Sequence, residues 1–253
     1  MKLIYKYRYL FYSIIIALVS TYLIFLTYGY KINWHTYKFE KTGLIYVASL
    51  PTQVNVYAGN NLVSDSTPLK YDNLFPGRYD FRLENEKYQT WEKTFNVKAD
   101  FVEQAADIVL ILKDIEEIPM TDAEKSNYQK KFTDELEMQN AGSDLIVRNT
   151  NELYFQDVFV TRMFSPINNP IWFADKKHII FQSENKINFM DSDGSNIKTL
   201  VVLADNSPVM FLSSDNGMYL IVSYKNEIKK YKITEIKSLF GEKYLNRAVK
   251  IIK

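Results

Sequence analysis

The sequence predicts a mainly β protein with an N-terminal transmembrane helix, a small antiparallel β-sandwich, a linker helix and then further antiparallel sheets. Three observations predict this order. Residues 9–30 carry no charged side chain, short strand-like segments separated by turn residues start near residue 42, and one helical pattern interrupts them after residue 120. Apolar and polar residues that alternate over several positions are typical of half-buried strands, and strands at regular short spacing favour a sandwich.

The run Tyr9–Tyr30 is long enough to cross a membrane. A helix of this length reaches about 33 Å, and the hydrocarbon core of a bilayer is about 30 Å thick. Bulky tyrosines follow Phe25, where a cleavable signal peptide needs small residues. Aromatic side chains flank the run as a belt: Tyr5, Tyr7, Tyr9, Tyr28, Tyr30 and Trp34. The sequence therefore predicts an uncleaved anchor that contacts the lipid bilayer through residues 9–30; the alternative is a signal peptide cut near Ala17–Ser20.

The basic residues around this run do not decide its orientation by number. Three precede it and three follow it closely: Lys2, Lys6, Arg8, Lys31, Lys38 and Lys41. A short basic tail beside a long folded region favours a cytoplasmic tail, since long domains translocate largely regardless of their charge. We therefore expect a single-pass protein of the cell membrane with residues 35–253 outside the cytoplasm.

Composition excludes several function classes. Lys and Arg number 31 against 30 Asp and Glu, so the net charge of +1 gives no field that would attract nucleic acid. The chain has no cysteine, which excludes disulfides, thiolate metal sites and cysteine nucleophiles. An extracytoplasmic chain that avoids oxidative chemistry fits this absence.

Between the anchor and residue 113, five segments are predicted strands of a sandwich. Their β-branched and aromatic residues alternate with polar ones, most clearly where Tyr79, Phe81 and Leu83 follow one another at every second position. Trp91 and Tyr79 are expected in its core. The segments are Thr42–Ser49, Gln53–Ala58, Arg78–Glu84, Tyr88–Val97 and Ala105–Leu112.

Landmarks in this region carry a resemblance to a known family. In order they are Val54-x-Val56-Tyr57 with the turn Gly59-Asn60, Ser66-Thr67-Pro68-Leu69, Leu74-x-Pro76-Gly77-x-Tyr79, and Tyr88-x-x-Trp91. Residues 43–112 therefore resemble a PEGA domain. Where the name-giving motif would stand, the chain has Pro51-Thr52-Gln53-Val54 and keeps only the proline. The resemblance implies a small surface sandwich without catalytic residues.

A helix is predicted to begin at the capping box Thr121-Asp122-Ala123-Glu124, in which the first and last residues satisfy each other's backbone N–H groups. Tyr128, Phe132 and Leu136 recur at four-residue spacing and form one narrow apolar stripe. Gly142 is placed to end the helix. A helix that packs on its own neighbouring domain is favoured over one that binds a partner.

The second β region repeats a phrase of an aromatic residue, a polar turn with Asp and a hydrophobic strand about 40 residues apart, in Trp172–Phe181 and in Phe211–Val222. Residues 143–233 are in this respect similar to TolB-type and WD-like propellers, with Asn151–Phe164 as a preceding half-blade. Two or three blades are fewer than a closed ring needs. An open stack, closure with another chain, and a likeness only to β-hairpins are the alternatives.

The apolar strand Tyr219–Tyr224 carries a condition on the end of the chain. If this strand lies at an edge, the basic tail or a partner must cover it. The predicted segments are then 1–34 for the tail and anchor, 35–113 for the sandwich, 114–142 for the linker, 143–233 for the blade-like region and 234–253 for the basic tail, which turns helix-like after Ile233.

No motif for catalysis or for a cofactor is present. The turn Asp191–Asn196 offers carboxylates to calcium, but an EF-hand loop has glycine sixth and glutamate twelfth, whereas Gly194 is fourth and Val202 twelfth. A hairpin turn is favoured there. The two histidines, His35 and His178, are too far apart in the chain for a His-x-x-x-His zinc pair and are expected to be structural. We predict no catalytic, cofactor-binding or metal-ligating residue.

These observations favour a membrane-anchored, extracytoplasmic protein that is not an enzyme. It is expected to bind a cell-envelope partner, either a protein or a cell-wall polymer, or to scaffold a surface assembly. The alternative is an envelope hydrolase that acts on glycan or peptide through a carboxylate pair formed only in the fold. A third reading is a subunit whose incomplete blades complete a complex.

Overall fold

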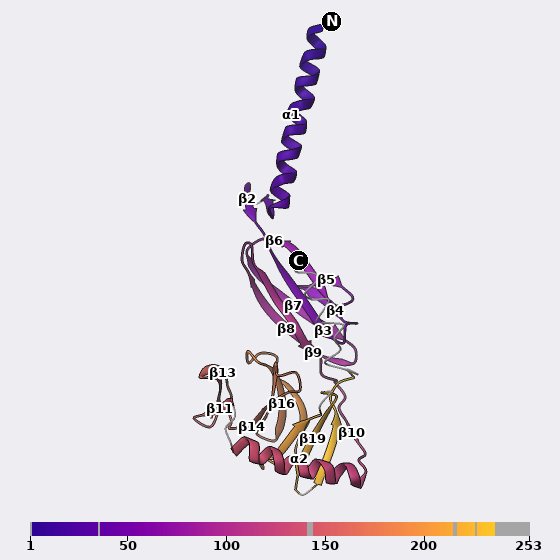
Figure 1. The fold of residues 1–253 in the computed structure, drawn as a ribbon, viewed down its shortest axis with the longest axis vertical. Helices are drawn as coiled ribbons and strands as arrows, with labels where there is room; N and C mark the ends of the chain where they lie inside the picture. The colour runs from indigo at the N-terminus through magenta and orange to yellow at the C-terminus, as the bar shows by residue number, and fades with distance from the viewer. Residues whose placement is uncertain (1, 35, 141–143, 215–216, 226, 236–253) are drawn as a thin grey trace.

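The computed structural model describes residues 2–34, 36–140, 144–214, 217–225 and 227–235. In this part of the chain there are two helices and twenty strands. From top to bottom, Figure 1 shows a projecting helix, a sandwich, and a group of further sheets with the second helix across their lower end. The predicted class, mainly β with several antiparallel sheets and two helices, is confirmed.

Helix α1 (Lys2–Thr27) projects away from the rest of the molecule (Figure 1). Its stretch Tyr7–Thr27 has 21 residues, long and apolar enough for a membrane span, and none of it is buried within the protein. The predicted apolar helix is therefore confirmed, but it ends at Thr27 and not at Tyr30, because Tyr30 is the first residue of the next strand. Whether it stays as an anchor or is removed as a signal peptide remains a prediction.

A hairpin that the sequence pattern did not predict joins α1 to the sandwich. Strand β1 (Tyr30–Asn33) pairs antiparallel with β2 (Lys38–Lys41). Gly29 has a φ of 77°, a left-handed conformation that favours glycine and lets the chain turn out of the helix. Its carbonyl accepts hydrogen bonds from the N–H of Thr42 at 2.9 Å and from the Thr42 hydroxyl at 3.0 Å. These bonds tie the end of the helix to the start of the sandwich.

The sandwich consists of two sheets. One has the order β6-β3-β9, formed by Leu69–Leu74, Gly43–Leu50 and Val102–Val109. The other has the order β5-β4-β7-β8, formed by Asn61–Ser64, Asn55–Ala58, Gly77–Asn85 and Tyr88–Val97. Strand β9 starts three residues earlier than predicted and pairs in parallel with β3. The pairing is parallel because β3, the first strand of the sandwich, and β9, its last strand, are neighbours in one sheet and run in the same direction.

The apolar faces of these two sheets form the core of the sandwich. Trp91 is only 3% exposed, as predicted, and packs with Ile45, Phe81, Leu83 and Phe95. Tyr79 is half-buried, and its hydroxyl donates a hydrogen bond to the carbonyl of Phe75 at 3.0 Å. The core prediction is thus confirmed for Trp91 and holds only in part for Tyr79, which packs against the core from its margin.

The second β region consists of three antiparallel sheets. The first joins β11 (Leu145–Arg148), β12 (Glu152–Phe155) and β13 (Val158–Arg162). The second joins β14 (Ile167–Trp172), β15 (His178–Ser183), β16 (Lys186–Asp191) and β17 (Lys198–Val202). The third joins β18 (Met210–Ser213), β19 (Tyr219–Tyr224) and β20 (Glu227–Lys232) with β10 (Glu116–Ile118). The described sheets close into no barrel, and the likeness to propeller blades remains a prediction.

Two strands of the third sheet differ from the sequence-based expectation. Strand β19 does not lie at an edge, because β18 pairs with it on one side and β20 on the other. The idea that the basic tail must cover β19 is therefore wrong. The edge next to β20 is occupied by β10, which comes from the segment expected to be linker. The tail from residue 236 onward, with its predicted helix, lies outside the described residues.

Helix α2 (Asp122–Asn140) begins at the predicted capping box. The N–H of Thr121 donates to Oε2 of Glu124 at 3.0 Å, and the N–H of Glu124 donates to Oγ1 of Thr121 at 3.3 Å. Phe132 is buried, and the helix packs on β18 and β20 of its own chain. The prediction of a helix packed on a neighbouring domain is confirmed. Gly142 and the side chain of Leu136 lie outside the described part.

Candidate functional site

A polar network joins the sandwich to the second sheet of the following region. Nε1 of Trp91 donates to Oδ2 of Asp191 at 3.0 Å, and the N–H of Glu92 donates to Oδ1 of Asn196 at 3.0 Å. Lys93 forms an ion pair with Asp193 at 2.8 Å. All three contacts connect β8 to the end of β16 and the turn that follows it. These contacts form a structural junction between the sandwich and the second sheet.

His178 contacts Asp191 at the start of this turn and is only 3% exposed. Its Nδ1 is 2.6 Å from Oδ2 of Asp175 and its Nε2 is 3.4 Å from Oδ1 of Asp191. The ring of Phe189 stacks on the imidazole with a centroid distance of 4.8 Å. Burial alone would lower the pKa of His178, but the hydrogen bonds and charges of Asp175 and Asp191 outweigh it and raise the pKa to about 9. The charged ring, held on both nitrogens and covered by an aromatic face, has the surroundings of a structural histidine.

The same contacts bear on the calcium alternative. Oδ2 of Asp191 accepts hydrogen bonds from Trp91, Asn196 and Ser195, and the Asp193 carboxylate is engaged by Lys93. In the described residues, no three Asp, Glu, His or Cys side chains are grouped so that they could hold a metal ion. The turn is a hairpin turn between paired strands, and its carboxylates hold the junction together.

The network predicts a pH dependence of stability. The pKa of His178 is raised from 6.5 to about 9 in the folded protein, so protonated His178 stabilises the fold fully below pH 6.5, and this stabilisation is lost as the pH rises through 9. The amount is on the order of 3 kcal/mol. Urea unfolding of the detergent-solubilised protein between about pH 6 and pH 10 measures it. The difference in unfolding free energy between the wild type and His178→Gln should shrink across this interval; a constant difference would contradict the charged histidine.

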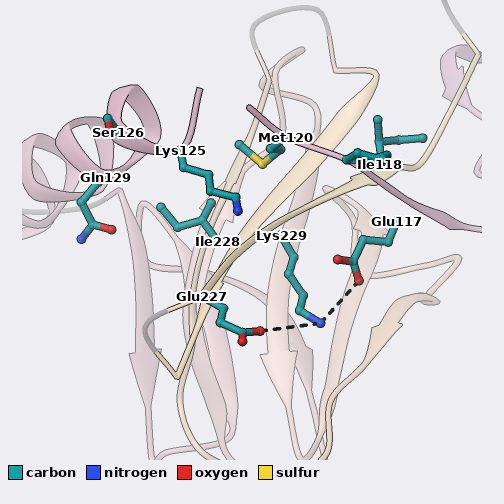
Figure 2. A pocket seen from close by; sticks show the side chains of 10 residues that line it. Glu117, Ile118, Met120, Lys125, Ser126, Gln129, Glu227, Ile228 and Lys229 are labelled. Carbon is teal, nitrogen blue, oxygen red and sulfur yellow. Dashed lines mark ion pairs between the residues drawn. The ribbon is translucent and has the colours of Figure 1, made fainter. Parts of the chain in front are cut away.

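A concave surface lies between α2, β10 and the start of β20 (Figure 2). This hollow, here called the α2 groove, has a volume of about 670 Å³. Ile118, Met120 and Ile228 supply its apolar surface, and Ser126 and Gln129 supply polar groups from the first turns of α2. Two stretches about 100 residues apart form it, residues 117–129 and residues 227–229, which is why sequence patterns did not reveal it.

One wall of the α2 groove is a piece of open sheet edge. Strand β20 has six residues, but the three-residue β10 pairs only with Lys230, Tyr231 and Lys232. Among the described residues, no strand pairs with residues 227–229 on this side, and these residues line the groove. Exposed strand edges offer backbone N–H and C=O groups that can pair with another extended chain.

Charges of both signs lie along this wall. Nζ of Lys229 is 3.4 Å from Oε2 of Glu117 and 4.0 Å from Oε2 of Glu227, as the dashed lines in Figure 2 show. The negative charge of Glu117 raises the pKa of Lys229, so the ammonium group keeps its charge. The side chains of Glu117 and Glu227 are 52% and 73% exposed. Both carboxylates are therefore in contact with solvent and not enclosed in an apolar pocket.

A second hollow of about 620 Å³ lies where the sandwich meets the end of the described chain. Four carboxylates and one ammonium group line it: Asp65, Glu84, Glu86, Glu235 and Lys87. Oε2 of Glu235 is 3.9 Å from Nζ of Lys87, and its Oε1 is 3.0 Å from Nζ of Lys232. These ion pairs lower the pKa of Glu235, which makes it unsuited to act as a general acid.

Comparison with known proteins agrees with the sandwich. Residues 42–106 match the family described as PEGA domain. The match covers both sheets of the sandwich up to the last residues of β9, and it confirms the resemblance predicted for residues 43–112. PEGA domains are typically extracellular. No curated protein matches the chain. The fold and this match define a chain with a PEGA domain next to an N-terminal apolar helix.

Proposed function

We propose that the protein is a single-pass, extracytoplasmic binding protein of the cell envelope, that it is not an enzyme, and that it binds an extended segment of another envelope protein in the α2 groove. Helix α1 anchors it, and the sandwich separates the anchor from the second β region. The single observation that carries this proposal is the edge of β20 at residues 227–229, which no described strand pairs with on this side and which lies in the wall of the groove.

The groove suits a protein segment better than a cell-wall polymer. An added strand gains affinity from main-chain hydrogen bonds and specificity from pockets for every second side chain. Ile118 and Met120 offer apolar surface for such a side chain, and Lys229 and Glu117 offer one charge of each sign. An anionic polymer would meet Glu117 and Glu227 as well as the lysines, and a polymer without backbone N–H groups would gain less from the strand edge.

A second candidate function is assembly of several copies through β13, the outer strand of the first sheet. Val158 is 67% exposed and Phe159 is 52% exposed on this strand, and Phe164 follows with its whole side chain in solvent. Neighbouring apolar side chains exposed on an edge strand favour pairing with another chain. This observation supports the hypothesis that the protein is a subunit whose blade-like sheets complete a complex.

Site-specific photo-cross-linking of the full-length protein in its own membrane separates the two functions. A photoreactive residue at Met120 reports on the α2 groove, one at Phe159 reports on β13, and one at Leu62, which is 56% exposed on the sandwich, serves as the control. We expect a discrete adduct from Met120 whose added mass is that of a different envelope protein. An adduct from Phe159 with the mass of a second copy, and none from Met120 above the Leu62 background, would replace the groove proposal by assembly.

A further inference from the structure

The hairpin β1–β2 carries aromatic side chains that are exposed to an unusual degree for a folded segment. Tyr37 is 82% exposed, Trp34 is 72% exposed and Phe39 is 52% exposed. Tyr28, between the helix and the hairpin, is 71% exposed. Exposed apolar side chains that gather in one place mark a surface that binds something. In Figure 1 this hairpin lies at the base of α1, between the helix and the sandwich.

The hairpin is held rigidly against the end of α1. The ring of Phe25 in the last turns of the helix stacks on Phe39 with a centroid distance of 5.3 Å and meets Tyr30 edge-on at 5.6 Å. On the other side, Lys41 forms an ion pair with Asp100 of the sandwich at 2.6 Å. The aromatic side chains therefore stay at a fixed height relative to the end of the apolar helix.

Charge and side-chain type identify the partner. Strands β1 and β2 carry Lys31, Lys38 and Lys41 against the single carboxylate Glu40, a net charge of +2 (three minus one). The Glu40 carboxylate accepts hydrogen bonds from Asn33 at 3.0 Å and from Thr36 at 2.8 Å within the hairpin. Trp and Tyr, with an apolar ring and one polar group, favour the headgroup layer of a bilayer, and lysine favours lipid phosphates.

We infer that the β1–β2 hairpin lies in the headgroup layer of the membrane that α1 crosses and binds phospholipid through Tyr28, Trp34, Tyr37 and Phe39. This layer extends about 5–7 Å beyond the hydrocarbon core on each side, and the hairpin starts three residues after the helix ends. The inference rests on the proposed anchor. It adds that the sandwich does not move freely relative to the anchor, because the hairpin fixes the height and tilt of the sandwich on the lipid surface.

Quenching of tryptophan fluorescence by brominated phospholipids tests this inference with the full-length protein in vesicles. Of the three tryptophans, Trp91 is 3% exposed in the sandwich core, and Trp172 lies in the second β region. We expect bromine near the glycerol end of the acyl chains to quench a part of the emission, and bromine near the methyl end to quench less. Trp34→Phe should abolish this quenching. In the matched control Trp34→Phe/Phe164→Trp, the indole moves to a fully exposed position just after β13 (Val158–Arg162), a strand of the second β region, and no quenching should return.

Flotation of the same vesicles distinguishes failure of the hairpin from failure of the anchor. Protein that floats with the vesicles, but whose Trp34 emission is untouched by bromine and fully quenched by acrylamide from the water, would overturn the hairpin inference and leave the anchor intact. Protein that does not float would overturn both.

Discussion

Replacing Asp191 by alanine is expected to destabilise the folded protein by about 3–5 kcal/mol, because it removes one partner from a buried charged group. The carboxylate of Asp191 lies 3.4 Å from Nε2 of His178 and accepts the Trp91 indole N–H at 3.0 Å. Its loss leaves a protonated imidazole with Asp175 as its remaining carboxylate partner in this network and a buried indole donor without an acceptor. Urea unfolding of the full chain in detergent measures the change.

Asp193, two residues further on in the same turn, provides the matched control. Its side chain is 48% exposed and pairs with Lys93 across the junction. Exposed ion pairs contribute about 1 kcal/mol or less, so Asp193→Ala should have a small effect. Equal losses of unfolding free energy in the two variants would show that Asp191 contributes no more than a surface group. That result would contradict a buried contact at the centre of the junction.

Replacing Trp91 by alanine is expected to cost about 3–5 kcal/mol, as other truncations of large buried aromatic side chains do. The side chain fills the sandwich core beside Phe81 and Leu83, and it also donates the hydrogen bond to Asp191. Trp91→Phe keeps most of the apolar volume and loses that hydrogen bond, so it should cost less, about 1.5–3 kcal/mol, as the loss of a bond to a charged group does. The same unfolding measurement compares the two variants.

The combination with Asp191→Ala separates packing from the hydrogen bond. Once Asp191 is absent, Trp91→Phe should have little further effect, because the two substitutions remove the same interaction. Fully additive effects of Trp91→Phe and Asp191→Ala would contradict a direct bond between the sandwich and the second β region. A Trp91→Ala variant with wild-type stability would contradict the core position of the indole.

The parts of this fold that sequence patterns predicted are those with local causes. The capping box needs only Thr121 and Glu124, three residues apart, and it formed as predicted. Strands β7 and β8 follow from alternating residues whose apolar members face one core. Helix α1 follows from the length of one uncharged run. In each case the residues that determine the element lie within the element.

The parts that escaped prediction depend on residues far apart in the chain. Strand β10 has three residues, too few to show any period, and exists because β20 offers it an edge. The contact between Trp91 and Asp191 spans 100 residues, and no spacing rule signals it. Tyr79 follows the same alternation as its core neighbours, yet it is only half-buried, and its hydroxyl is hydrogen-bonded to the carbonyl of Phe75. The α2 groove had no sequence signal because two distant stretches form it, residues 117–129 and residues 227–229.

The central claim is that α1 anchors the chain and places the sandwich and the second β region outside the cytoplasm. The chain has no cysteine, so a single introduced cysteine can be labelled without background. Val158→Cys reports on the second β region at a position that is 67% exposed, and Lys2→Cys reports on the N-terminal tail.

Labelling of spheroplasts with a membrane-impermeant maleimide tests this claim most directly. The account predicts that Val158→Cys is labelled in intact spheroplasts, that Lys2→Cys is labelled only after lysis, and that both labelled bands have full length and sediment with membranes. Protection of Val158→Cys until lysis would contradict the extracytoplasmic placement. A Val158→Cys band below full length, together with no labelled Lys2→Cys band even after lysis, would show that α1 is removed as a signal peptide.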